Sequence, residues 1–408
     1  MSTEANSGRI HSMDQFRGYT VAGMFVVNFL GGMEAIHSLF KHNNTYFSYA
    51  DSIMPSFMFA CGFSYRLSML RRLARIGQAA TWRHAIVRGL ALVLVSVMMF
   101  GFGDGFKSWS QMTSGGVHEF IAKLLKANLW EVLAIIGMTQ ILILPVITAG
   151  PRVRLLATLG LVVANVVLAD LFNWNFVHGL PNLVSDYWGA ARSRAWDGGA
   201  FGLLGWAIPM LAGTLAYDVM AASPPVRSAR TFLAWGAVLM GIGYAFSCLT
   251  TLYDVDATQP PAKRAELADS PVRPPLARIK GRSLSSLLAE PPFVAPPPAS
   301  TRQHNYWMMG KRMPSMTFTV FSTGFALAVY ALFILGSDVG SLRVRLFNTL
   351  GQNALVAYLI HHAVETTIHA IVPKDSPLGW CLTGLVLFLG ITYLFVDFLE
   401  RRSIHVRL

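Results

Sequence analysis

The chain has 408 residues, of which 53% are hydrophobic and only 13% are charged, with a net charge of +12. Soluble proteins carry about 25% charged residues, so this composition excludes an ordinary soluble domain and indicates a membrane protein. The basic residues lie mostly between apolar runs and form no basic-aromatic motif, so we expect no nucleic-acid partner and take the charge as a signal of membrane topology.

The apolar runs have the length of helices and lack the alternation of barrel strands. They predict an all-α, polytopic membrane helix bundle of about ten transmembrane helices. The expected spans are 16–33, 51–70, 85–104, 129–149, 154–172, 200–220, 231–252, 314–336, 347–371 and 378–399. Residues 1–9 hold no basic segment directly before an apolar core, so we expect the first span to be a retained helix, not a signal peptide.

Arginines gather in alternate short connectors and in the C-terminal tail. They are Arg71, Arg72, Arg75, Arg83, Arg88, Arg152, Arg154, Arg227, Arg230, Arg343, Arg345, Arg401, Arg402 and Arg407. The positive-inside rule places these connectors and both termini in the cytoplasm. The protein is then expected to be an integral, multi-pass protein of the bacterial inner (plasma) membrane, with the lipid bilayer as its surroundings.

The pattern divides the chain into three parts. Residues 1–252 hold the first seven spans, residues 253–313 form a Pro-rich extracytoplasmic insertion, and residues 314–408 hold the last three spans. The stretch from Asp254 to about Pro298 is polar and rich in proline, so we expect it to bury no core and to be flexible or extended.

The first two spans form a predicted transmembrane hairpin whose polar connector contains His42. A histidine in such a connector is often only a solvated side chain. A histidine side chain in general titrates near neutral pH, which suits a general base. The sequence interpretation therefore gives His42 the central chemical role.

Three further polar residues of the hairpin each allow two interpretations, because polar groups within a membrane are costly. Asn28 makes an interhelical hydrogen bond or donates to a carbonyl oxygen in a polar pocket. Asp51 caps the second helix or orients His42. Arg17 anchors the helix at the membrane interface or pairs locally with Asp14, or it contacts a phosphate from the cytoplasmic side.

The ninth span adds Asn353, His361, His362 and Glu365. The two adjacent histidines cannot share one helix face, so at most one of them shares a cavity with His42. His361 and Glu365, four residues apart, form a structural pair or part of a proton-handling site. The chain has no zinc-protease, nucleophile-elbow, P-loop or dinucleotide motif, and its three cysteines lie in apolar runs, so we expect no metal site and no disulfide.

Several segments together resemble a known family. They are residues 12–18 with the run ending at Val27-Asn28, Lys41-His42, residues 49–59 with Gly62, residues 351–355 with Tyr358 and His361, and more weakly Asp197 with residues 202–204. These segments resemble the catalytic region of the heparan-α-glucosaminide N-acetyltransferases and their bacterial relatives. The insertion has no obvious counterpart in that family.

The resemblance implies an acyl-CoA-dependent acyltransferase. Acetyl-CoA would be the cytoplasmic acyl donor, and a glycan or amino sugar on the far side would accept the acetyl group at an amine or a hydroxyl. By position, His42 matches the catalytic histidine and Asn28 matches the asparagine that assists at the acetyl group, with Asp51 as the third catalytic candidate. Direct transfer and an acetyl-histidine intermediate both stay open.

The phosphates of CoA would suit arginines at the cytoplasmic end, so Arg17 and Arg345 are expected donor contacts, together with Asn353 and His361. Two other classes of function stay open. A secondary transporter would show internal repeats with paired broken helices, and none is detected. A non-catalytic subunit of a membrane complex would keep the fold with His42 facing no cavity. A homodimer is also open.

Overall fold

A computed structural model describes residues 10–102, 105–188, 194–255, 266–402 and 404, and within these ranges the chain is helical and forms no strand. The helices are α1 (His11–Gly31), α2 (Tyr49–Ile76), α3 (Gln78–Ser96), α4 (Ser114–Lys123), α5 (Val132–Ile143), α6 (Pro151–Leu168), α7 (Trp174–His178), α8 (Leu183–Trp188), α9 (Gly199–Ala222), α10 (Pro225–Ser247), α11 (Met316–Phe333), α12 (Arg345–Gln352), α13 (Ala354–His369) and α14 (Leu378–Arg401). The predicted all-α class is confirmed.

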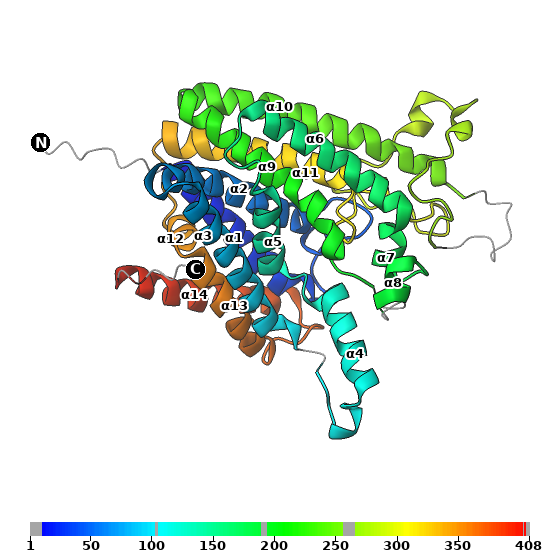
Figure 1. Cartoon of the computed structure of the whole chain (residues 1–408), viewed down its shortest axis with the longest axis horizontal. Coiled ribbons are helices and arrows are strands. Elements are labelled where there is room, and N and C mark those ends of the chain that lie inside the picture. Colours follow the sequence, from blue (N-terminus) through cyan, green and yellow to red (C-terminus); the bar gives the residue numbers. More distant parts are fainter. Residues whose placement is uncertain (1–9, 103–104, 189–193, 256–265, 403, 405–408) are drawn as a thin grey trace, which may run out of the picture.

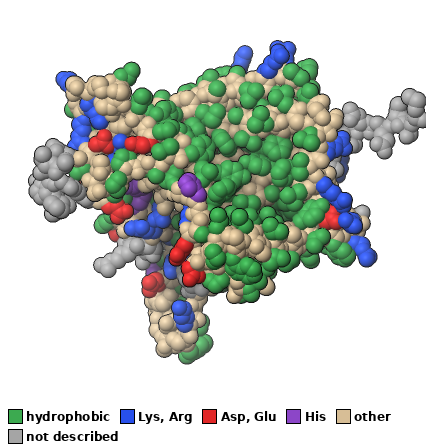
Figure 2. All heavy atoms as spheres, turned by 180° about the vertical axis from the view of Figure 1, so that it is seen from behind, with side chains coloured by type: hydrophobic (Ala, Val, Ile, Leu, Met, Phe, Trp, Pro, Cys, Tyr) green, Lys and Arg blue, Asp and Glu red, His purple; other side chains and the backbone are tan. Residues whose placement is uncertain are grey.

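The long helices run mostly along the long axis of the molecule, and α4 projects away from the bundle (Figure 1). On the face drawn in Figure 2, hydrophobic side chains cover a broad central area and most charged side chains gather toward the two ends. Such an apolar belt suits contact with lipid. The chain is therefore an integral, multi-pass membrane protein.

Each of the ten expected spans overlaps a helix, but six helical segments within the described ranges are long and apolar enough to cross a membrane. These segments are 78–101, 151–178, 199–222, 225–253, 316–339 and 378–401. The count of ten spans stays a prediction. The chain ends expected in the cytoplasm, residues 1–9 and 405–408, lie outside the described residues.

Helices α9 and α11 form the centre of the bundle, since 67% of the most apolar window of each is buried. Helix α2 packs closely against α9, where an ideal Cβ added to Gly62 would lie 1.8 Å from the backbone oxygen of Met210. In return, a Cβ on Gly213 of α9 would lie 2.0 Å from the backbone oxygen of Phe59. Both positions therefore require glycine.

An ion-paired group joins three helices, with two buried arginines sharing one aspartate. Nε of Arg66 on α2 lies 3.2 Å from Oδ1 of Asp218 on α9, and Arg154 on α6 pairs with the other oxygen of the same carboxylate. Arg154 also donates to Oγ1 of Thr214 over 2.8 Å. Because buried charges are costly unless they are paired, this group fixes how α2, α6 and α9 meet.

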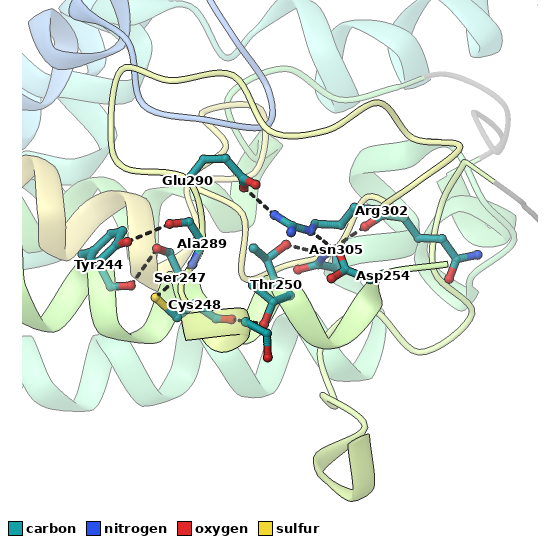
Figure 3. A network of polar contacts seen from close by, with 12 residues as sticks. Tyr244, Ser247, Cys248, Thr250, Asp254, Ala289, Glu290, Arg302 and Asn305 are labelled. Carbon is teal, nitrogen blue, oxygen red and sulfur yellow. Dashed lines mark hydrogen bonds and ion pairs between the residues drawn. The ribbon is translucent and has the colours of Figure 1, made fainter. Parts of the chain in front are cut away.

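The Pro-rich insertion differs from its expectation. Arg302 is 5% exposed and lies 2.6 Å from Asp254 and 2.5 Å from Glu290 (Figure 3). Tyr306 and Trp307 are buried in an apolar cluster that also contains residues of α7 and α11. Ala268 and Val272 belong to the same cluster, so for the described part of the stretch from Asp254 to Pro298 the expectation that it buries no core is wrong. A few aromatic anchors and one bridging arginine order the segment, and its prolines lower the entropy cost of doing so.

The expected span 347–371 is interrupted. Helix α12 ends at Gln352 and α13 begins at Ala354, because Asn353 has φ −116° and ψ 38°, outside the helical range. Non-helical backbone at membrane depth is tolerated where it lines a cavity or is buried in protein.

Candidate functional site

The connector between α1 and α2 holds a hydrogen-bonded histidine–aspartate pair. Nδ1 of His42 lies 3.0 Å from Oδ1 of Asp51, whose side chain is fully buried, while 32% of the His42 side chain is exposed. The second oxygen of Asp51 accepts from the Ser48 hydroxyl over 2.7 Å and from the backbone N–H of Asn43 over 3.1 Å. The carboxylate is thus held by three donors from one short segment.

This arrangement decides between the two interpretations of Asp51. Ser48 is the N-cap of α2, since its hydroxyl accepts from the backbone N–H of Asp51 over 3.3 Å. The Asp51 carboxylate is left to orient His42. Because an ionised carboxylate only accepts, Nδ1 carries the proton and Nε2 keeps its lone pair. The pair therefore holds the imidazole ring of His42 in one orientation.

Asn28 lies near the end of α1 and lines a small middle cavity of about 50 Å³ together with His42 and Lys311. Within the described residues its side chain makes no hydrogen bond to another residue, so the interhelical interpretation finds no support there. Its amide is available to a ligand in the cavity.

Three neighbouring cavities share lining residues of the hairpin. The outer cavity, of about 480 Å³, shares His42 with the middle cavity. The inner cavity, of about 430 Å³, shares Val21, Met24 and Phe57 with the middle cavity. We call these three side chains the neck; the names outer and inner follow the positive-inside prediction. His42 thus lies in the wall that the outer and the middle cavity share.

The inner cavity is lined by Arg17, Arg72 and Arg88 and by the break between α12 and α13. Arg17 donates to Oδ1 of Asp14 over 3.0 Å and to the backbone oxygen of Gly351 over 2.5 Å. The local pair expected for Arg17 is therefore present, and the residue lines a cavity as well. Three arginines in the lining of one cavity suit a phosphorylated ligand.

Asn353 lines the inner cavity, but two other residues expected to contact the donor do not line it. The ring of His361 stacks on Phe25 at 5.0 Å between centroids, and its Nδ1 contacts the backbone oxygen of Tyr358. Arg345 is 68% exposed and pairs with Asp397 of α14 over 2.9 Å. Packing on Phe25 accounts for the position of His361, and the surface ion pair with Asp397 accounts for that of Arg345.

The sequence interpretation missed one charged residue of the site. Nζ of Lys311 lies 3.7 Å from Oδ1 of Asp197, with 9% and 3% of the two side chains exposed. Burial raises the pKa of Asp197, and the Lys311 ammonium and the nearby His42 oppose that rise. The sequence offered one signal for Lys311, namely that it lies three residues before an apolar run. It was instead interpreted as one more charge of the insertion.

Arg72 and Arg88 were also missed as cavity residues, because the sequence interpretation used them only to assign topology. Their convergence depends on how α2 packs against α3, which the spacing of residues along the chain does not show.

Comparison with known proteins gives one match. A family model described as Heparan-alpha-glucosaminide N-acetyltransferase, catalytic, matches residues 9–244, which is more than half of the chain and includes the connector with His42. No curated protein matched the sequence.

Proposed function

The chain belongs to the family of the heparan-alpha-glucosaminide N-acetyltransferase catalytic domain, and we propose that it transfers an acetyl group from acetyl-CoA in the inner cavity to a sugar amine or hydroxyl in the outer cavity. The observation that carries this proposal is the position of His42, which lines both the outer and the middle cavity. We further propose that the protein lies in the bacterial inner membrane, with the arginine-lined end toward cytoplasmic acetyl-CoA.

Two residues of the hairpin, His42 and Asn28, have defined roles in the proposed reaction. Nε2 of His42 takes the proton of the acceptor as the acceptor's nitrogen or oxygen attacks the thioester carbon. The amide of Asn28 donates to the carbonyl oxygen as negative charge develops on it. The carbon–sulfur bond then breaks, the CoA thiolate leaves toward the inner cavity, and the proton held by His42 neutralises the leaving sulfur or is released.

The inner cavity suits the donor because phosphates and guanidinium groups form charge-assisted hydrogen bonds. Arg17, Arg72 and Arg88 would hold the phosphates, while the neck of Val21, Met24 and Phe57 leads to the middle cavity. The long arm of CoA ends in the thioester, which can then reach Asn28 while the phosphates stay at the arginines.

Two observations favour a transferase over the other classes of function. A non-catalytic subunit would leave His42 facing no cavity, yet His42 lines two of them. A transporter also needs access to its binding site from both sides of the membrane. It has no need, however, of a buried carboxylate such as Asp51 that fixes the tautomer of a histidine in that site.

The test uses purified protein in sealed vesicles, with labelled acetyl-CoA on one side and glucosamine on the other. We expect labelled N-acetylglucosamine on the acceptor side and free CoA on the donor side, formed at equal rates. Vesicles without protein set the background. Failure to bind acetyl-CoA, or product formed only when both substrates are on the same side, would overturn the proposal.

Replacing Lys311 with methionine should lower kcat by roughly 10²-fold, because a fixed positive charge near the reacting carbonyl is lost. The change also leaves Asp197 buried without its partner, which itself costs stability. The Lys311→Met/Asp197→Asn double variant separates these effects: we expect thermal stability to recover and kcat to stay low. Wild-type kcat in the double variant would show that Lys311 acts only as a partner of Asp197.

A further inference from the structure

The Pro-rich insertion contributes a long segment to the lining of the outer cavity. We call residues 289–298 the strap; five of its ten residues are proline. Residues 296–298 of the strap and residues 42–46 of the connector line the outer cavity, so the strap and His42 border the same space. The strap lies beyond residues 9–244, the part of the chain that the family model matches, so membership of the family does not by itself assign it a role.

Polar contacts fix both ends of the strap (Figure 3). At its start, Tyr244 of α10 donates its hydroxyl to the backbone oxygen of Ala289 over 2.7 Å. Arg302 pairs with Glu290 over 2.5 Å, and its backbone N–H donates to the backbone oxygen of Pro298 over 3.0 Å. Because each proline fixes its own φ, the segment between these contacts has few conformations open to it.

Between its ends the strap is bonded to the connector that holds His42. The backbone N–H of Phe293 donates to the backbone oxygen of Phe47 over 2.8 Å, and the two rings lie 5.4 Å apart. Phe47 is fully buried. It directly precedes Ser48, the cap of α2 whose hydroxyl donates to the Asp51 carboxylate. The contact with the strap therefore lies beside the groups that orient His42.

Phe293 makes this contact in a strained backbone conformation. Its φ is +72°, in the left-handed region that residues other than glycine rarely adopt. Strained conformations persist where surrounding contacts enforce them, and they are frequent at functional sites. The side chain of Phe293 is 40% exposed, so the burial of a core residue does not enforce this φ. We attribute it to the contact with Phe47.

A second part of the insertion packs on the same connector. A Cβ added to Gly310 would lie 2.3 Å from the backbone oxygen of Asn44, so this close approach requires glycine. The next residue, Lys311, lines the middle cavity together with His42. The insertion thus holds the connector at two positions, Asn44 and Phe47, which both follow His42 closely in the chain.

We propose that the insertion positions His42 for the acetyl transfer, with Phe293 as a positioning residue that acts through the backbone of Phe47. Without this contact, the connector would keep its hydrogen bonds to Asp51 but lose its support from the insertion. His42 would then spend less time in the orientation that faces the outer and the middle cavity. The effect on turnover rests on the proposed acetyl transfer; the effect on the connector does not.

Two substitutions at Phe293 separate the hydrogen bond from the ring. Both Phe293→Gly and Phe293→Pro remove the ring, but glycine adopts a positive φ freely and keeps the N–H, whereas proline fixes φ at about −65° and has no N–H. Hydrogen exchange of residues 38–51, measured by mass spectrometry on the full-length protein without substrates, reports on the connector. We expect exchange at least about 5-fold faster in the proline variant, since one net backbone hydrogen bond is lost. Equal exchange in the two variants would overturn the proposal.

Steady-state kinetics tests whether the contact serves catalysis. We expect kcat for acetyl transfer to be about 10-fold lower in Phe293→Pro than in Phe293→Gly, because a misplaced reacting group slows the chemical step. The KM for acetyl-CoA should be equal in the two variants, since neither the strap nor the connector lines the inner cavity. A general loosening of the fold would change both constants. Equal kcat in the two variants would overturn the positioning role.

Gly310→Ala tests the second contact, and does so even if the proline variant does not fold. The added Cβ would push the insertion away from Asn44, so exchange of residues 38–51 should again rise and kcat should fall. Lys280→Gln changes an exposed residue of the insertion that lines neither the outer nor the middle cavity, and it should behave like the wild type. Thermal unfolding in detergent checks the fold of each variant. Wild-type exchange and kcat in Gly310→Ala would contradict the proposal.

The two proposals fail differently. Faster exchange of the connector in Phe293→Pro, in a protein that forms no acetylated product, would support the contact between strap and connector and overturn the transferase. Acetylated product formed with equal kcat by both Phe293 variants, with equal exchange, would support the transferase and overturn the role of the insertion.

Discussion

Replacing His42 with alanine will lower kcat for acetyl transfer by about 10²- to 10⁴-fold, the usual contribution of a positioned general base. Acetyl-CoA should bind unchanged, because His42 does not line the inner cavity. The measurement is release of free CoA with an amino-sugar acceptor. His37→Ala is the matched control, since His37 lies in the same connector, where its Nδ1 accepts from the backbone N–H of Leu39, and it does not line the outer or the middle cavity.

Asp51→Asn is the second variant of this prediction. An asparagine retains the size of the side chain, but its NH₂ group can face Nδ1 and turn the imidazole to the other tautomer. We expect kcat to fall by roughly 10²- to 10⁴-fold with little change in KM, because in catalytic histidine–aspartate pairs the aspartate holds the histidine in the tautomer that can accept a proton. Full activity in His42→Ala would exclude His42 as the base, and full activity in Asp51→Asn would reduce Asp51 to a structural role.

Gly62→Ala will destabilise the folded bundle. A Cβ at this position would lie 1.8 Å from the backbone oxygen of Met210, and no side-chain rotation can relieve a clash with backbone. Helices α2 and α9 must then separate. Overpacking costs about 1–3 kcal/mol, which exceeds the gain of about 0.5–1 kcal/mol that alanine brings to a helix interior. A lower midpoint of thermal unfolding in detergent is the expected result.

Gly160→Ala is the matched control for this change. Gly160 lies within α6, and an added Cβ would meet nothing within 4 Å. Alanine at Gly160 should leave the unfolding temperature unchanged or raise it slightly. If Gly62→Ala unfolds at the wild-type temperature, the close approach of α2 and α9 is not needed for stability.

The sequence was most informative where one short segment supplies several functional groups. His42 and Asp51 are nine residues apart across one connector, so the pattern of a polar residue between two apolar runs already placed them together. The assignment of Asp51 required the structure, because Ser48 had to be identified as the cap before the carboxylate was free to orient the histidine.

The sequence was least informative where distant segments meet. Lys311 and Arg312 looked like charges of a Pro-rich loop, and only tertiary packing brings them beside Asp197 and Trp196. The same limit explains His361, whose position in a family-like segment predicted a donor contact, while its ring packs on Phe25. Hydropathy identifies which segments are apolar, but it does not show which helix face meets which neighbour.

The neck between the cavities also bears on how the membrane stays electrically sealed. In the proposed arrangement, where the outer and inner cavities open toward opposite sides of the membrane, Val21, Met24 and Phe57 would be the main dielectric between them. Most of a membrane potential would then fall over this short apolar stretch, where each 100 mV is worth about 2.3 kcal/mol per unit charge. An ion pays a desolvation penalty there that an uncharged acetyl group does not. The proposed acetyl transfer and the insulation would thus depend on the same three side chains, and a polar residue at Met24 would be expected to let protons leak across the membrane.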